Sequence, residues 1–120
     1  MITGLGIDSI EIVRVAQKCA DPASRFAERM FTPEERERAA QRKHAPYEHL
    51  AACFAAREAF FKATQIRSLG AQVSAGLRES GEPYYILAPQ VAARLGKRRV
   101  LLSLTHDRTH ATAVCVCETA

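Results

Sequence analysis

Long apolar runs are missing from this sequence. None approaches the ~20 consecutive apolar residues that a membrane-spanning helix needs, so we expect no membrane segment. The first residues show no basic stretch followed by an apolar one, and we therefore expect no secretory signal and a cytoplasmic protein. A glycine-rich phosphate loop, a CxxC pair, a nucleophile elbow and helix-turn-helix spacing are also lacking. The functions that depend on those motifs are not indicated.

The spacing of the cysteines excludes two further classes of protein, zinc-binding domains and disulfide-rich domains. The four cysteines, Cys19, Cys53, Cys115 and Cys117, have neither the spacing of a zinc site nor that of a dense disulfide framework. Cys115 and Cys117 alternate with valines, which predicts small hydrophobic side chains on one face of a strand.

What is present is the composition of an ordinary globular protein. The 120 residues, 48% hydrophobic and 25% charged, predict a single domain over residues 1–120. A formal charge of +4 with 17 basic residues suggests an anionic partner without identifying it. Nucleic acid, phosphorylated small molecules and acidic proteins all fit that charge.

Residues 46–64 predict one long helix that is apolar on nearly every side, and such a helix is buried. A strand over residues 2–7 precedes it. Three helices also precede it. The first begins at about residue 10, and a short second one is opened by Asp21 and Pro22. The third is a charged surface helix over residues 34–43, begun by the capping box of Thr32 and Glu35. After a loop over 66–72, strands are expected at 73–78, 84–87, 99–105 and 110–117, with a short helix from Pro89 closed by Gly96. This order predicts an α+β fold in which an antiparallel sheet packs around the long helix.

Two acidic residues have competing interpretations. From local physics alone Asp8, three residues before Glu11, is best interpreted as a helix cap. Glu58 precedes Lys62 by four residues, which is also the spacing of an ordinary helix ion pair. Alanines lie on the same face of the helix as Glu58 and Lys62. The alternative to an exposed ion pair is therefore a tight pocket around the Glu58 carboxylate. Arg57 points about 100° away from Glu58, and a solvated or snorkelling side chain is expected there.

Two other features bear on a site. His106 and Asp107 fall in a turn between two predicted strands, where a solvent-facing histidine is the simplest interpretation. A metal held by Asp8 and Glu58 would have sparse, oxygen-only ligands. That set favours Mg²⁺, which keeps waters and binds one or two carboxylates together with substrate phosphates.

Five blocks of sequence resemble the holo-acyl-carrier-protein synthase family of small 4′-phosphopantetheinyl transferases. They are GLGID at residues 4–8 followed by EI at 11–12 and RV at 14–15, RMFTPEE at 29–35, FAAREAFFKA at 54–63, GEP at 81–83 and LSLTHD at 102–107. The blocks occur in the family's order and cover essentially the whole chain.

The resemblance implies a reaction and a site. Members transfer 4′-phosphopantetheine from coenzyme A to a serine of apo acyl carrier protein, release adenosine 3′,5′-bisphosphate, and commonly form homotrimers with active sites between subunits. By the match, Asp8 and Glu58 bind Mg²⁺ and act in catalysis with Lys62. Lys62 and His106 contact the phosphates or ribose of coenzyme A, and Pro83 lies near the adenine. Arg14 faces the acidic carrier protein, with Arg25 as a second candidate. A metal-bound water or one of the carboxylates could serve as base.

This chain departs from the family's pattern at two places. The family usually has lysine where Arg57 stands, a change that keeps charge but alters geometry. It also usually has a segment of the Gly-Thr-Gly type after the long helix, where this chain has bulkier residues from Gln65 to Gly70. The altered loop motivates a second hypothesis, a non-catalytic binder of coenzyme A or of an acidic protein. A nucleic-acid-binding domain ranks last, because no aromatic residues or recognition helix accompany the basic residues.

Overall fold

The computed structural model describes residues 1–68 and 70–120. In chain order the elements are β1 (Ile2–Glu11), α1 (Ile12–Ala20), α2 (Phe26–Met30), α3 (Pro33–Ala40), α4 (Pro46–Thr64), a 3₁₀ turn (Gly70–Gln72), β2 (Val73–Leu77), β3 (Pro83–Leu87), α5 (Pro89–Leu95), β4 (Arg99–His106) and β5 (His110–Glu118). This arrangement confirms the α+β prediction. Within the described residues no helix is long and apolar enough to cross a bilayer.

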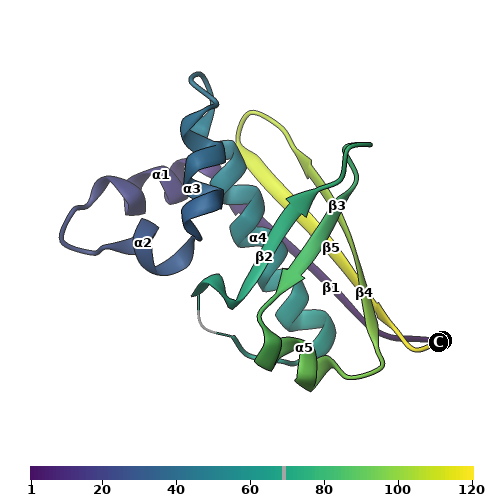
Figure 1. The fold of residues 1–120 in the computed structure, drawn as a ribbon. Helices are drawn as coiled ribbons and strands as arrows, with labels where there is room; N and C mark the ends of the chain where they lie inside the picture. The colour runs from purple at the N-terminus through teal and green to yellow at the C-terminus, as the bar shows by residue number, and fades with distance from the viewer. Residues whose placement is uncertain (69) are drawn as a thin grey trace.

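Helix α4 is the centre of the molecule, as its apolar sequence predicts. A three-stranded antiparallel sheet of order β1-β5-β4 covers one side of it, and the β2-β3 hairpin covers another (Figure 1). The C-terminal half of α4 packs on β2, β5 and α5, where the predicted inward pair Cys115 and Cys117 is fully buried. Its N-terminal half packs on α1, α2 and α3.

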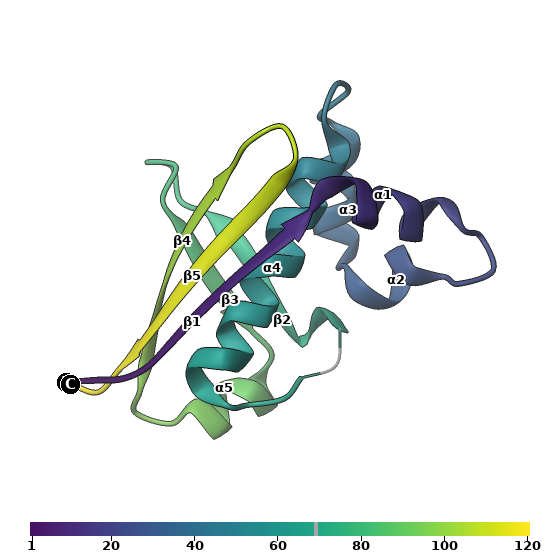
Figure 2. The same ribbon diagram turned by 180° about the vertical axis from the view of Figure 1, so that it is seen from behind.

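Strand β1 is longer than predicted and lies unusually close to α4 (Figure 2). A Cβ built on Gly4 would lie 1.8 Å from the carbonyl oxygen of Ala63, and one built on Gly6 would lie 2.0 Å from that of Ala59. Only glycine permits this approach of strand to helix backbone. The two glycines therefore fix the distance between β1 and α4.

The helix starts were predicted with mixed success. The capping box of α3 is confirmed: Thr32 Oγ1 accepts from Glu35 N at 3.0 Å, and Glu35 Oε1 accepts from Thr32 N at 2.9 Å. The start expected at Asp21 is wrong, because the Asp21 carboxylate accepts from Ala23 N in a turn and α2 begins only at Phe26. A short polar side chain can stabilise a turn as well as a helix.

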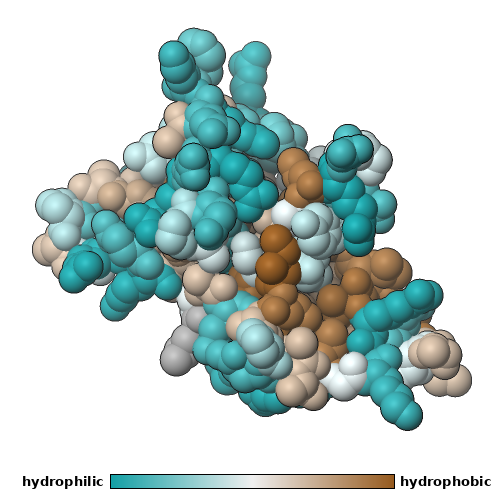
Figure 3. Space-filling model, viewed as in Figure 1, coloured by the Kyte–Doolittle hydropathy of each residue, from teal (hydrophilic) through white to brown (hydrophobic). Residues whose placement is uncertain are grey.

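The surface presents two different characters. Hydrophobic side chains gather over β2, β3 and β4, whereas the helical part of the chain is mostly hydrophilic (Figure 3). The outer face of the three-stranded sheet also carries exposed apolar residues, among them Leu5 at 67%, Ile7 at 58% and Leu101 at 50% exposure.

Candidate active site

Asp8 lies in the middle of β1, on the side of the strand that faces α4. It shares this side with Gly4 and Gly6, and successive side chains of a strand alternate between faces. Lys62 Nζ on α4 lies 3.4 Å from Asp8 Oδ1 and donates to the Ile7 carbonyl oxygen at 2.8 Å. The structure thus brings together two of the predicted site residues.

The interpretation of Asp8 as a helix cap is wrong. Helix α1 begins after Glu11, which makes no side-chain capping bond, and Asp8 pairs with Ala113 in the sheet. Asp8 and Glu11 have the spacing of a capping box, but β1 pairs with β5 as far as residue 11 and so includes both residues. Tertiary pairing overrides a local signal here.

Glu58, one helical turn before Lys62 on α4, lines a cavity of about 460 Å³. We call this space the Glu58 cavity; its other walls include Met30, Arg57, Phe61, Arg67 and Gln72. Glu58 is partly buried and makes no hydrogen bond or ion pair with any described residue. The ordinary helix pair with Lys62 does not form, since Lys62 turns to Asp8 instead.

Arg57, the residue before Glu58, is not the solvated or snorkelling side chain that we expected. It is only 6% exposed and pairs with Glu35 of α3, which is 0% exposed, at 3.1 Å. Its Nε also donates to the Val73 carbonyl oxygen at 2.7 Å. Arg57 therefore connects α4 to α3 and β2, and the prediction that α3 is purely a surface helix fails at Glu35.

The altered loop after α4 is held at its start by hydrogen bonds to the end of the helix. Gln65 ends the helix in the left-handed conformation at φ 60°, and its N–H donates to the Phe61 carbonyl oxygen at 2.7 Å. Thr64 Oγ1 donates to the Phe60 carbonyl oxygen and accepts from Ile66 N, whose side chain is buried. The predicted loop also contains Leu69, which lies outside the described residues.

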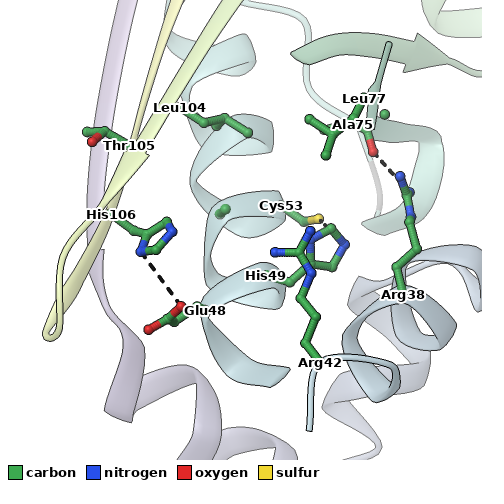
Figure 4. Close-up of a pocket in the computed structure, with 12 residues that line it drawn as sticks. Arg38, Arg42, Glu48, His49, Cys53, Ala75, Leu77, Leu104, Thr105 and His106 are labelled. Carbon is green, nitrogen blue, oxygen red and sulfur yellow. Dashed lines mark hydrogen bonds and ion pairs between the residues drawn. The ribbon is translucent and has the colours of Figure 1, made fainter. Parts of the chain in front are cut away.

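His106 lies at the rim of a second cavity, of about 130 Å³, between α3, α4, β2 and β4 (Figure 4). We call it the His106 cavity; it is also lined by Arg38, Arg42, Glu48, His49 and Cys53. His106 Nδ1 lies 3.7 Å from Glu48 Oε2, and Arg38 donates to the Ala75 carbonyl oxygen at 3.1 Å. The expectation of a merely solvent-facing His106 is incomplete, because its ring is half exposed but directed at Glu48 (Figure 4).

Sequence reasoning missed His49 and Cys53. Cys53 Sγ lies 3.7 Å from His49 Nε2. Burial, and then the charges of Arg42 and Arg38, lower the pKa of His49 to about 4, while burial and the Glu35 carboxylate raise the pKa of the Cys53 thiol. Both side chains are therefore neutral at pH 7. Their i, i+4 spacing on the buried helix was the available signal, but it did not show which residues of α3 would face them.

Asp107 organises the turn beside His106. Its Oδ1 accepts from the backbone N–H groups of Thr109 and His110, each at 2.8 Å. These bonds, that from His110 first, hold the pKa of the exposed Asp107 carboxyl below its usual range. Asp107 thus has a structural task at the end of β4.

The remaining predicted residues lie apart from one another. Pro83 begins β3 and pairs with Leu77, which lines the His106 cavity. Arg14 is exposed on α1, and Arg25 is exposed just before α2. Glu58 and His106 line different cavities of the chain. The chain therefore displays the predicted residues on several surfaces.

Comparison with known proteins gives a consistent result. The family model of the 4′-phosphopantetheinyl transferase superfamily matches residues 4–115. The chain is 37% identical to a holo-[acyl-carrier-protein] synthase of Chlamydia trachomatis serovar L2, over 96% of this chain and 98% of the relative. It is 38% identical to one of Thermus thermophilus, over 98% and 94%.

Solved structures agree with the sequence matches. The structure of the Chronobacterium ammoniagenes ACPS-CoA complex superposes with a TM-score of 0.86 at 32% identity, covering 98% of this chain and 97% of that one. The matched span includes both carboxylates and the helix between the two cavities. The chain belongs to the 4′-phosphopantetheinyl transferase superfamily, a family of enzymes, and within it to the holo-[acyl-carrier-protein] synthases.

Proposed function

We propose that this enzyme transfers 4′-phosphopantetheine from coenzyme A to a serine of an apo acyl carrier protein and releases adenosine 3′,5′-bisphosphate. We assign it to the cytoplasm and to the synthesis of fatty acids or related lipids. One observation carries the assignment: Glu58, in a matched block, is a partly buried carboxylate in a cavity and has no partner among the described residues. A partly buried carboxylate without a protein partner in a cavity favours a cation or a hydrogen-bond donor from a ligand.

The donor set suits Mg²⁺ shared with a substrate. Glu58 is unpartnered in the described chain, and Asp8 has Lys62 beside it. No group of three or more metal-ligating side chains occurs among the described residues, so a complete protein cage is not offered. Mg²⁺ binds through one or two carboxylates plus phosphates. Asp8 and Glu58 would hold it, and when bound it would neutralise charge on the diphosphate.

Lys62 is suited to phosphate binding. Its side chain is half exposed and is anchored by the Ile7 carbonyl oxygen, so its ammonium group is held next to Asp8 while solvent still reaches it. A lysine of this kind supplies a compact positive charge for a phosphate oxygen. A metal-bound water or one of the carboxylates, Asp8 or Glu58, would accept the serine proton.

The other end of coenzyme A is assigned to the His106 cavity and the adjoining strand. His106 would contact a phosphate or the ribose, and Pro83 would lie near the adenine. Support comes from the charges: Arg38 and Arg42 line the same cavity, against one carboxylate, Glu48. Such a cavity favours an anionic ligand.

The carrier protein is assigned to the first helices. Arg14 and Arg25 are exposed on one helical part of the chain, and neither forms an ion pair with a described residue. Exposed cations of this kind accelerate and orient the encounter with an acidic protein.

We further propose a homotrimer with active sites between subunits. Leu5, Val116 and Leu101 lie in one row across β1, β5 and β4, and two of them are at least half exposed. Exposed apolar patches mark association surfaces. The separation of Glu58 from His106 within one chain is expected if neighbouring subunits complete each site. Sedimentation equilibrium should give a trimer for the wild type and a monomer for Leu5→Lys; a monomeric wild type would contradict the proposal.

The transfer itself is tested by intact-mass spectrometry. Apo carrier protein is incubated with the enzyme, coenzyme A and Mg²⁺, and a mass gain equal to phosphopantetheine is expected. Absence of that gain across fatty-acid and polyketide carriers would overturn the proposal. Coenzyme A binding without transfer would instead support the non-catalytic binder, and strongly salt-dependent binding of nucleic acid would support a nucleic-acid-binding domain.

A further inference from the structure

The loop that follows α4 places a cation in the Glu58 cavity. Arg67 follows the buried Ile66, and its carbonyl oxygen accepts from Arg94 Nη1 of α5 at 3.3 Å. The backbone of Arg67 is therefore anchored by the buried side chain of Ile66 and by the hydrogen bond from Arg94 of α5. This is the segment where glycines of the family pattern are replaced by larger residues.

The Arg67 side chain is stacked on an aromatic ring. Its guanidinium carbon lies 4.6 Å from the centroid of Phe61, which stands three residues after Glu58 on α4. Residues three apart are neighbours on a helix surface, so Phe61 connects the cation to the carboxylate's side of the helix. Arg67, Phe61 and Glu58 all line the same cavity.

The hydrogen-bonding capacity of Arg67 is not used within residues 1–68 and 70–120. Its side chain makes no hydrogen bond or ion pair there, and its recorded contact is with the Phe61 ring. A contact with an aromatic ring uses none of the guanidinium's five N–H donors, which are free to donate to a ligand. By contrast Arg57, which also lines this cavity, is buried and already binds Glu35 and the Val73 carbonyl oxygen, and of its nitrogens Nη1 alone has no partner among the described residues.

We propose that Arg67 binds the diphosphate of coenzyme A, and that Phe61 is a positioning residue that holds the guanidinium for this contact. The inference rests on the proposed function, because it is Glu58 that identifies this cavity as the diphosphate's place. A planar guanidinium donates two parallel bonds to phosphate oxygens, which an ammonium cannot do. In this chain a side-chain cation thus takes the place of backbone contacts from a glycine-rich loop.

The test measures the Kd of coenzyme A by calorimetry without carrier protein, and KM and kcat with it. Arg67→Ala should raise Kd and KM about 10- to 100-fold, the usual effect of losing a hydrogen bond to a charged group. Arg67→Lys should recover only part of the loss. Phe61→Leu should raise KM about 2- to 5-fold, and Phe61→Tyr should restore it. Lys97→Ala, an exposed residue that removes the same charge, is the matched control.

Dephospho-coenzyme A identifies the phosphate. Because this ligand keeps the diphosphate and lacks the 3′-phosphate, the penalty of Arg67→Ala should persist with it. A penalty that disappears would move Arg67 to the 3′-phosphate and overturn the assignment, as would an Arg67→Ala variant with unchanged Kd and KM. A wild type that binds coenzyme A but transfers nothing would contradict the proposed function while leaving the Kd comparison valid.

Discussion

Arg57 and Glu58 are consecutive charged residues on one buried helix, yet they have opposite surroundings. Arg57 turns toward α3 and β2, where Glu35 and the Val73 carbonyl oxygen bind it. Glu58 turns into a cavity and has no partner in the described chain. A buried charge that is paired with an opposite charge belongs to the fold, whereas a carboxylate left without a protein partner indicates a ligand. The comparison separates structure from function at neighbouring positions.

The largest expected effect is on Glu58. Glu58→Gln keeps the shape of the side chain but removes its charge, so kcat should fall on the order of 10³-fold, as when one preorganised electrostatic contact is lost. The free energy of unfolding should stay within about 0.5 kcal/mol of the wild type, because no protein partner is lost. Single-turnover mass spectrometry and urea unfolding measure the two quantities. Glu37→Gln, exposed on α3, is the control, and equal loss of activity in both variants would remove the distinction.

Arg57 should show the reverse pattern. Arg57→Met leaves the Glu35 carboxylate buried and unpaired, which should lower the free energy of unfolding by about 3–5 kcal/mol. The double variant Glu35→Leu/Arg57→Met should recover much of that loss, since no charge remains buried. Urea unfolding of the two single variants and the double variant gives the coupling energy. A coupling near zero would contradict the structural role of this pair.

Gly6 tests how the strand delivers Asp8 to the helix. A Cβ at Gly6 meets the Ala59 carbonyl oxygen, so Gly6→Ala should cost about 1–3 kcal/mol of stability and push β1 away from α4. Because Asp8 is two residues along the strand, activity should fall as well. Gly4→Ala makes the same clash farther from Asp8 and should reduce activity less for a similar loss of stability. Equal activity in both variants would contradict the assignment of Asp8 to the active site.

The smallest expected effect concerns His49 at the other end of α4. Its pKa is about 4 in the folded protein, below the ordinary value of 6.5, so the unfolded chain binds more protons between these pH values. Stability should therefore fall as pH drops through this window, by up to about 2 kcal/mol between pH 6.5 and 5. His49→Gln should lack this component. Urea unfolding at both pH values measures it, and an unchanged pH slope would contradict the burial of a neutral imidazole.

The sequence predicted the helix over residues 46–64 and the capping box at Thr32 and Glu35, because both depend on local patterns. It failed at Asp8, where a capping pattern lies inside a strand that pairs with β5. It also failed at Arg57, whose partner Glu35 is 22 residues away. Periodicity places a residue on a face of an element, but it does not say which distant side chain will meet that face.

In the site, too, contacts between distant residues could not be predicted from the sequence. Resemblance predicts Asp8, Glu58, Lys62 and His106 as site residues, but it did not predict that Lys62 would pair with Asp8 rather than with Glu58. Nor did it indicate the stacking of Arg67 on Phe61, which depends on the path of a loop without glycine at residue 65. These contacts depend on the relative positions of strand, helix and loop.

The most direct test of the account compares Glu58→Gln with Arg57→Met in a single-turnover mass assay at a temperature where both variants are folded. We predict that Arg57→Met, though less stable, still adds phosphopantetheine to the carrier protein, whereas Glu58→Gln, with unchanged stability, adds almost none. An active Glu58→Gln variant would contradict the claim that this unpartnered carboxylate is the functional one.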